Sequence, residues 1–80
     1  MSTDLILETI TATVRDELED DSIVLTLQTR AKDVPGWDSL AHVRIVVGVE
    51  VAYGVEFNTN DVVGLKNVGD LVRLVESTRR

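Results

Sequence analysis

Cysteine is absent from this 80-residue chain, and aromatic side chains make up only 4% of it. The lack of cysteine excludes disulfides, thiolate metal sites and a cysteine nucleophile. Hydrophobic residues still account for 44% of the chain, so its core must be built from Val, Leu and Ile. The longest apolar run, Ile45 to Val49, is far too short to cross a bilayer.

Basic residues are also few, with 8 against 14 acidic residues and a net charge of -6. This balance opposes nucleic-acid binding, which needs cations to neutralise phosphates, and it favours partners with basic docking surfaces. The segment from Met1 to Ile10 contains Asp4 and Glu8 and has no basic region of the kind that opens a signal peptide. We therefore expect a cytoplasmic protein that does not bind nucleic acid and does not insert into membranes.

Eighty residues are expected to form a single domain spanning residues 1–80. A chain this short buries only about 60% of the surface that its unfolded form exposes. There is room for three or four helices around one apolar seam, but little room for a deep catalytic cleft. We expect an all-helical monomer that is not an enzyme and holds no metal.

The first 21 residues have the pattern of an amphipathic helix. Thr3 is a candidate N-cap, and four aliphatic residues recur every four positions on one face: Ile6, Ile10, Val14 and Leu18. Three acids at 19–21 oppose the helix dipole, so we expect the helix to end there. The stretch 22–37 is predicted to be a long loop with a short helical turn, because the chain offers no second strand to pair with it.

A second helix is predicted from Asp38 or Ser39, which are both good N-cap types, to Tyr53, with Gly54 as its stop. Its many β-branched residues make a strand the competing interpretation. A cap cluster at 58–61 opens a brief third helix that ends at Gly64. A final helix begins within 67–70 and runs to the basic tail Arg79-Arg80.

The second helix is apolar on two faces. One face carries Ile45, Val46, Val49 and Tyr53, and the other carries Leu40, Val43, Val47 and Val51. Only one broad face of a helix can be buried in a small bundle. The second face is therefore either an exposed partner surface or the side of a helix that is covered twice. Periodicity does not decide between the two.

Ser39 lies where the loop meets this helix. Taken by itself, the Asp38-Ser39 pair is most simply an ordinary helix cap. His42 lies three residues on and shares a helix face with Ser39, but the sequence indicates neither an orienting acid nor an oxyanion site. Self-contained hydrolysis by Ser39 and His42 is therefore not expected.

The stretch from Gly36 to Val43, GWDSLAHV, resembles the attachment motif of the acyl carrier protein family, whose core is Asp-Ser-Leu. The resemblance continues through Glu50, the run 53–57 and the run 67–71, and it covers about residues 34–75. It implies a four-helix bundle whose serine, Ser39 here, is modified by a phosphopantetheinyl transferase. The 4′-phosphopantetheine arm, taken from coenzyme A, then holds acyl groups as thioesters on its thiol.

The resemblance also implies roles for the residues around Ser39. Asp38 would lie at the modification site and help to order the metal and phosphate contacts of the transferase. Leu40, Val43 and Val47 would form the apolar docking face, with Arg44 and Glu50 beside it. The partners implied are the transferase, an acyl-loading ligase or transferase, and downstream acyl-processing enzymes.

The chain departs from the family pattern in charge. The second helix of the fatty-acid carriers that it resembles is strongly acidic, whereas this helix has Arg44, and has Ala41 and Val51 where the family often has acids. We therefore expect a stand-alone carrier of a specialised biosynthetic pathway. An aminoacyl or peptidyl carrier is the first alternative, and a helical interaction module in which Asp38-Ser39 is only a cap is the second.

Overall fold

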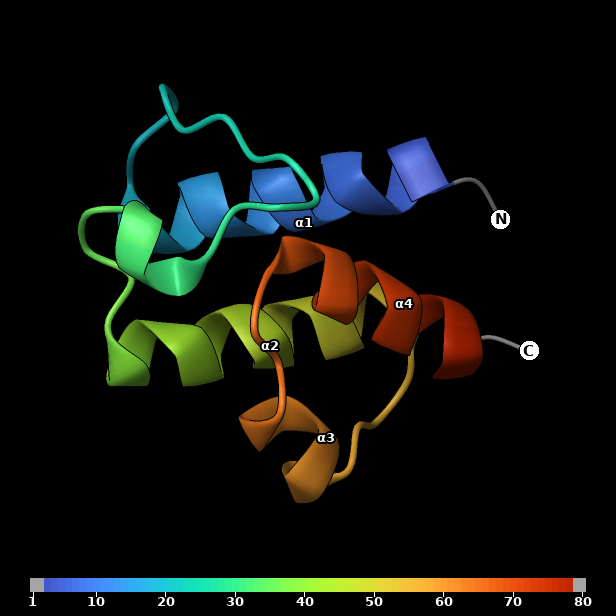
Figure 1. Ribbon diagram of the computed structural model, residues 1–80. Helices are drawn as coiled ribbons and strands as arrows, with labels where there is room; N and C mark the ends of the chain where they lie inside the picture. Colours follow the sequence, from blue (N-terminus) through green and yellow to red (C-terminus); the bar gives the residue numbers. More distant parts are fainter. Residues whose placement is uncertain (1–2, 79–80) are drawn as a thin grey trace.

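The computed structural model describes residues 3–78, and every regular element in that range is helical. The helices are α1 (Thr3–Leu18), α2 (Ser39–Tyr53), α3 (Thr59–Val63) and α4 (Val68–Thr78), with a 3-10 turn at Ala31–Asp33. Figure 1 shows the long connection that passes over α1 before it enters α2, and the short α3 on the side of α2 away from α1. The all-helical prediction is confirmed, with the long loop and the brief third helix. The predicted basic tail Arg79-Arg80 lies outside the described residues.

The core is an aliphatic seam between α1, α2 and α4. Helix α1 contacts both of the others, and its predicted inner residues Ile6, Ile10 and Val14 are fully buried, whereas Leu18 is half-buried at the edge. Thr3 is already part of α1, so it does not cap the helix as predicted. Its hydroxyl instead donates a hydrogen bond to the Glu76 carboxylate of α4, at 3.0 Å.

Helix α1 ends in a Schellman motif. The Asp20 N–H donates to the Arg15 carbonyl at 3.0 Å and the Glu19 N–H donates to the Asp16 carbonyl at 3.3 Å, which are the two bonds that define this cap. The motif places Glu19 in the left-handed region, with φ 52°. A residue with a Cβ is strained there, and its negative charge also opposes the helix dipole.

We therefore expect Glu19→Gly to stabilise the protein by about 0.5–1 kcal/mol, because glycine adopts the left-handed conformation without steric cost. Chemical denaturation measures the change. Glu17→Gly is the matched control, since position 17 lies inside the last turn of α1 and glycine there should cost about 1 kcal/mol. Equal effects of the two substitutions would show that the strain at position 19 contributes nothing.

Helix α2 has the caps that the sequence predicts. The Asp38 carboxylate accepts a hydrogen bond from the Ala41 N–H at 2.8 Å, and Gly54, at φ 64°, closes the C-terminus in the left-handed region. The helix buries Ala41, Ile45, Val46 and Val49. The opposite row is exposed, at 61% for Leu40, 56% for Val43, 48% for Val47 and 77% for Val51. Residues 3–78 therefore cover only one face of α2. The second apolar face is an exposed surface and not the side of a helix that is covered twice.

The long loop is fastened to the start of α4 by backbone hydrogen bonds. The Val68 N–H donates to the Thr29 carbonyl and the Gly69 N–H donates to the Leu27 carbonyl, each at 2.8 Å. These bonds satisfy two of the N–H groups that a helix leaves unpaired at its first turn. Ile23 and Leu25 anchor the same loop in the core. The loop is therefore a fixed part of the bundle.

None of the helices described is long and apolar enough to cross a membrane.

Candidate functional site

Ser39 is the first residue of α2, and its side chain is exposed. The capping role belongs to its neighbour, because the Asp38 carboxylate makes the side-chain bond to the helix N-terminus. The Ser39 hydroxyl forms no hydrogen bond with any residue in the described range 3–78. The structure therefore leaves at the start of α2 a hydroxyl that the helix does not need for its own stability.

Ser39 opens into a groove of about 690 Å³ between α2, α3 and the 3-10 turn. We call this the Ser39 groove; its lining residues are Ala31, Lys32, Trp37, Asp38, Ser39, His42, Val43, Thr59, Val62, Val63 and Leu65. Aliphatic side chains of α2 and α3 supply much of its wall, and Lys32 is its one cationic side chain. The groove has the apolar lining with a few polar groups that is typical of ligand sites.

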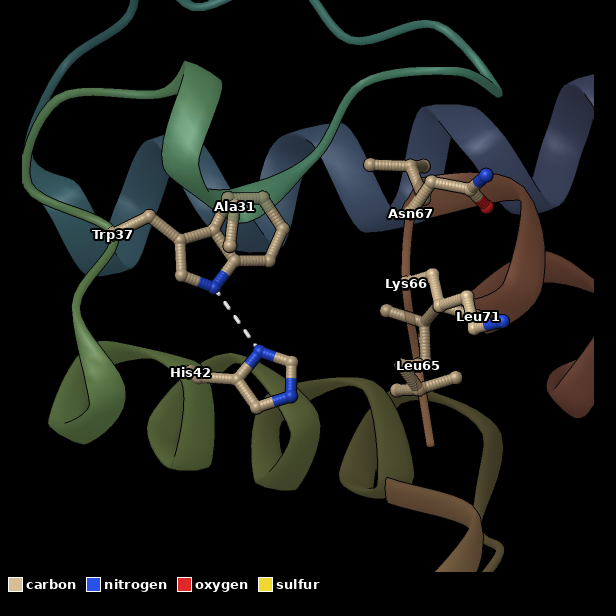
Figure 2. A pocket seen from close by; sticks show the side chains of 8 residues that line it. Ala31, Trp37, His42, Leu65, Lys66, Asn67 and Leu71 are labelled. Carbon is tan, nitrogen blue, oxygen red and sulfur yellow. Dashed lines mark hydrogen bonds between the residues drawn. The ribbon is translucent and has the colours of Figure 1, made fainter. Parts of the chain in front are cut away.

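A hydrogen-bonded aromatic pair borders the groove. The Trp37 indole Nε1–H donates to His42 Nδ1 at 3.1 Å, and the two rings stack with centroids 6.1 Å apart and planes 28° apart. Figure 2 shows this bond, with His42 reaching from α2 towards Trp37. Because an indole N–H can only donate, Nδ1 is the acceptor, and the proton of the neutral imidazole is on Nε2.

Trp37 and His42 also border a second, smaller space of about 30 Å³. Its other walls come from the 3-10 turn, from the segment between α3 and α4, and from α4 itself, and Figure 2 places Leu65, Lys66, Asn67 and Leu71 across from the pair. A volume near that of one water molecule holds no sizeable ligand. The ligand-sized space beside Ser39 is therefore the groove.

His42 and Ser39 do not form a catalytic pair in this geometry. The Nδ1 atom of His42 is already bonded to Trp37, and no acid within residues 3–78 orients the ring. Nor do residues 3–78 contain a group of three His, Asp or Glu side chains that could hold a metal ion. Among the residues that the structure describes, the site therefore presents a hydroxyl and a groove, and no base is bonded to the hydroxyl.

The exposed apolar row of α2 continues from Ser39 along the helix. Arg44 is exposed beside it and forms no ion pair with the part of the chain that the structure describes. Ala41 and Val51 stand where the resembled family often has acidic residues. Ala41 is buried, with 5% of its surface exposed, and Val51 is exposed. Glu50 is half-buried, and its Oε2 accepts a hydrogen bond from the Phe57 N–H at 2.7 Å. Glu50 therefore fixes the link after α2, and its predicted part in partner binding stays a prediction.

Sequence reasoning missed the Trp37–His42 bond and the part of Lys32, Val62 and Leu65 in the groove. The signal for the pair was present, since the lone Trp lies two residues before Ser39 and the lone His three residues after it. No such signal marked Lys32, Val62 and Leu65, because they come from the 3-10 turn, from α3 and from the segment after α3.

Comparison with known proteins shows what the whole chain is similar to. Residues 8–75 match the family described as "Phosphopantetheine attachment site". The chain is 29% identical over 72 residues to an acyl carrier protein of Helicobacter acinonychis, covering 90% of this chain and 92% of that one. It is 25% identical over 75 residues to an acyl carrier protein of Rickettsia typhi, covering 94% and 87%.

A solved structure is also similar. It is the solution NMR structure of a holo acyl carrier protein from Geobacter metallireducens, with 44% sequence identity and a TM-score of 0.83. The match covers 90% of this chain and 83% of that one. At this identity and TM-score, the two chains have the same fold.

Proposed function

This chain belongs to the phosphopantetheine attachment family, that of the acyl carrier proteins, and from that premise we propose that it carries acyl intermediates of a specialised biosynthetic pathway on an arm attached to Ser39. Proteins of this family carry 4′-phosphopantetheine covalently and are not enzymes. The same therefore holds for this chain. The proposal adds the attachment residue, the docking face and the kind of pathway.

The exposed, unbonded hydroxyl of Ser39 is the observation that carries the proposal. It is the first residue of α2, it lines a groove large enough for a ligand, and the cap of the helix does not use it. These features suit a phosphodiester on Oγ, because attachment there breaks no contact within residues 3–78. When bound, the arm supplies the thiol for thioester formation that a chain without cysteine lacks.

The docking face is proposed to be Leu40, Val43 and Val47, which adjoin Ser39 on the uncovered side of α2. An exposed apolar row of this kind is typical of a partner surface. Arg44 lies beside the row, and Asp38 lies next to the modified serine, where it would help to order the metal and phosphate contacts of the transferase. The partners are a phosphopantetheinyl transferase, an acyl-loading ligase or transferase, and downstream acyl-processing enzymes.

Intact mass tests the attachment. The apo protein is incubated with coenzyme A and a transferase of broad specificity, and the modified peptide is located by tandem mass spectrometry. We expect a gain of one phosphopantetheine unit on the peptide that contains Ser39. No gain, or a gain elsewhere in the chain, would contradict the proposal.

Arg44→Glu tests the specialised pathway. Arg44 has the wrong sign for an enzyme that binds an acidic helix, and a like-charge contact at an interface can cost several kcal/mol. We expect a fatty-acid synthase enzyme that normally uses an acidic carrier to turn over the wild-type holo protein slowly. The Arg44→Glu holo protein should be used better at low salt, with the gain shrinking as salt rises.

Arg73→Glu is the control, since it changes the charge by the same amount on α4, which does not line the Ser39 groove. Because Arg73 forms an ion pair with Asp70, circular dichroism first establishes that this variant is folded. It should leave turnover close to the wild-type value. Equal turnover of all three proteins at both ionic strengths would show that Arg44 has no part in partner selection.

A further inference from the structure

We propose that a groove between α1 and the long loop is a second docking surface, which binds an amphipathic helix of a partner protein that is rich in lysine or arginine. We call it the α1 groove; its volume is about 530 Å³. None of its lining residues belongs to the Ser39 groove or to the exposed row of α2. In Figure 1 the loop runs along the side of α1 away from α2. A partner held here therefore leaves Ser39 and α2 accessible to another protein.

The wall that α1 contributes is a stripe along one face of the helix. Its members recur at three- and four-residue spacing: Asp4, Leu7, Glu8, Thr11, Ala12 and Arg15. From the rise per residue of an α-helix, this stripe is about 16 Å long, which is the length of about three helical turns. A straight wall of that length suits a second helix laid alongside α1, because helices pack side by side over such faces.

The opposite wall presents an apolar side chain that the core does not use. Ile23 and Leu25 belong to the core, at 8% and 6% exposure, whereas Val24 between them is 76% exposed. Arg15 fixes this wall in place, because its Nε–H donates to the Ile23 carbonyl at 2.7 Å. Leu7 is half-buried and adds to the apolar surface from the side of α1. The groove therefore offers apolar groups, held in position, that the apolar face of a partner can cover.

The charge of the chain decides which kind of helix fits. Residues 1–22 contain seven acids and one base, whereas residues 23–80 contain seven of each, so the first 22 residues account for the whole net charge of -6. Asp4 and Glu8 line the groove, and Asp16 is exposed farther along α1. A helix with lysines or arginines beside its apolar face meets opposite charge here, and bases one turn apart match acids four residues apart. A second copy of this chain would meet charge of its own sign.

An NMR titration of the apo protein tests the proposal, and the apo form makes the result independent of attachment at Ser39. The probe is a stapled helical peptide of about four turns, with leucines on one face and lysines beside them. We expect the largest amide shifts at Leu7, Glu8 and Val24, and a Kd that rises with salt. A peptide with serine in place of leucine, or glutamate in place of lysine, should bind about tenfold more weakly or worse.

Two variants remove the two kinds of contact. Val24→Ser and Glu8→Lys should each weaken binding of the peptide about tenfold, and both side chains are exposed, so the fold should be retained. Val63→Ser and Glu56→Lys are the matched controls and should keep the wild-type Kd. Val63 is 79% exposed, Glu56 is exposed, and neither lines the α1 groove. Circular dichroism establishes that all four variants are folded.

A wild-type Kd for either Val24→Ser or Glu8→Lys would overturn the proposal, and so would the absence of saturable binding. Largest shifts at Leu40, Val43 and Val47 would also overturn it, because the peptide would then prefer the uncovered face of α2. Shifts at Val24 that grow with protein concentration without peptide would show that a second copy occupies the groove instead.

Discussion

Ser39→Ala is expected to abolish attachment of the arm completely and to leave the stability of the protein almost unchanged. The substitution removes the only proposed nucleophile for coenzyme A, so the mass gain falls to zero. The fold should tolerate it, because the Ser39 hydroxyl bonds to nothing within residues 3–78 and alanine is a better helix former than serine. Intact mass and chemical denaturation measure the two effects.

Two further variants complete this comparison. Ser77→Ala removes another exposed hydroxyl and should keep the full mass gain. Asp38→Ala removes the cap bond to the Ala41 N–H and should cost about 1 kcal/mol of stability. If Ser39→Ala costs as much stability as Asp38→Ala, then Ser39 is a structural cap after all. If the Ser39→Ala protein still gains mass, another residue carries the arm.

Gly69→Ala is expected to lower the stability by about 1–3 kcal/mol, as overpacking of a closely packed site does. A Cβ at position 69 would lie 2.8 Å from the Leu27 carbonyl oxygen and 3.2 Å from Asn67 Oδ1. The Leu27 carbonyl belongs to the backbone and accepts from the Gly69 N–H itself, so α4 or the loop must shift and strain that bond. In a domain of this size, Tm should fall on the order of 10 °C.

The sign of this effect is informative, because alanine normally stabilises a helix by up to about 1 kcal/mol relative to glycine. Gly64→Ala is the control. Its nearest contact would be the Asn60 carbonyl oxygen at 3.4 Å, so we expect a change within about 0.5 kcal/mol. Thermal unfolding measures the Tm of both variants against that of the wild type. A Gly69→Ala protein as stable as the wild type would show that the loop yields freely.

Much of the fold follows from local chemistry. Asp38 and Gly54 bound α2 because one accepts from the first turn and the other adopts the left-handed conformation. Both signals are present in single residues, which is why the sequence predicts this helix against the β-branched preference of its interior. The same holds for the long loop with a short turn and for the brief helix that ends at Gly64.

Other features depend on contacts between distant segments, which periodicity does not contain. Which face of α2 is buried depends on where α1 and α4 pack. The attachment of the loop to α4 uses the backbone carbonyls of Leu27 and Thr29. Every residue type has a backbone carbonyl, so the sequence does not indicate which of them will be used. At the site, the motif located Ser39 and Asp38, but the wall formed by Val62 and Leu65 arises only once α3 lies beside α2.

The single tryptophan of the chain makes the site optically visible. Trp37 is 9% exposed, packs in the core, lines the Ser39 groove and is bonded to His42. We therefore expect its fluorescence to report two events: global unfolding, which moves the indole into water, and binding of any group in the groove, which changes the surroundings of the ring. We expect such binding to be measurable in real time without a label, because the protein has no other indole to obscure the signal.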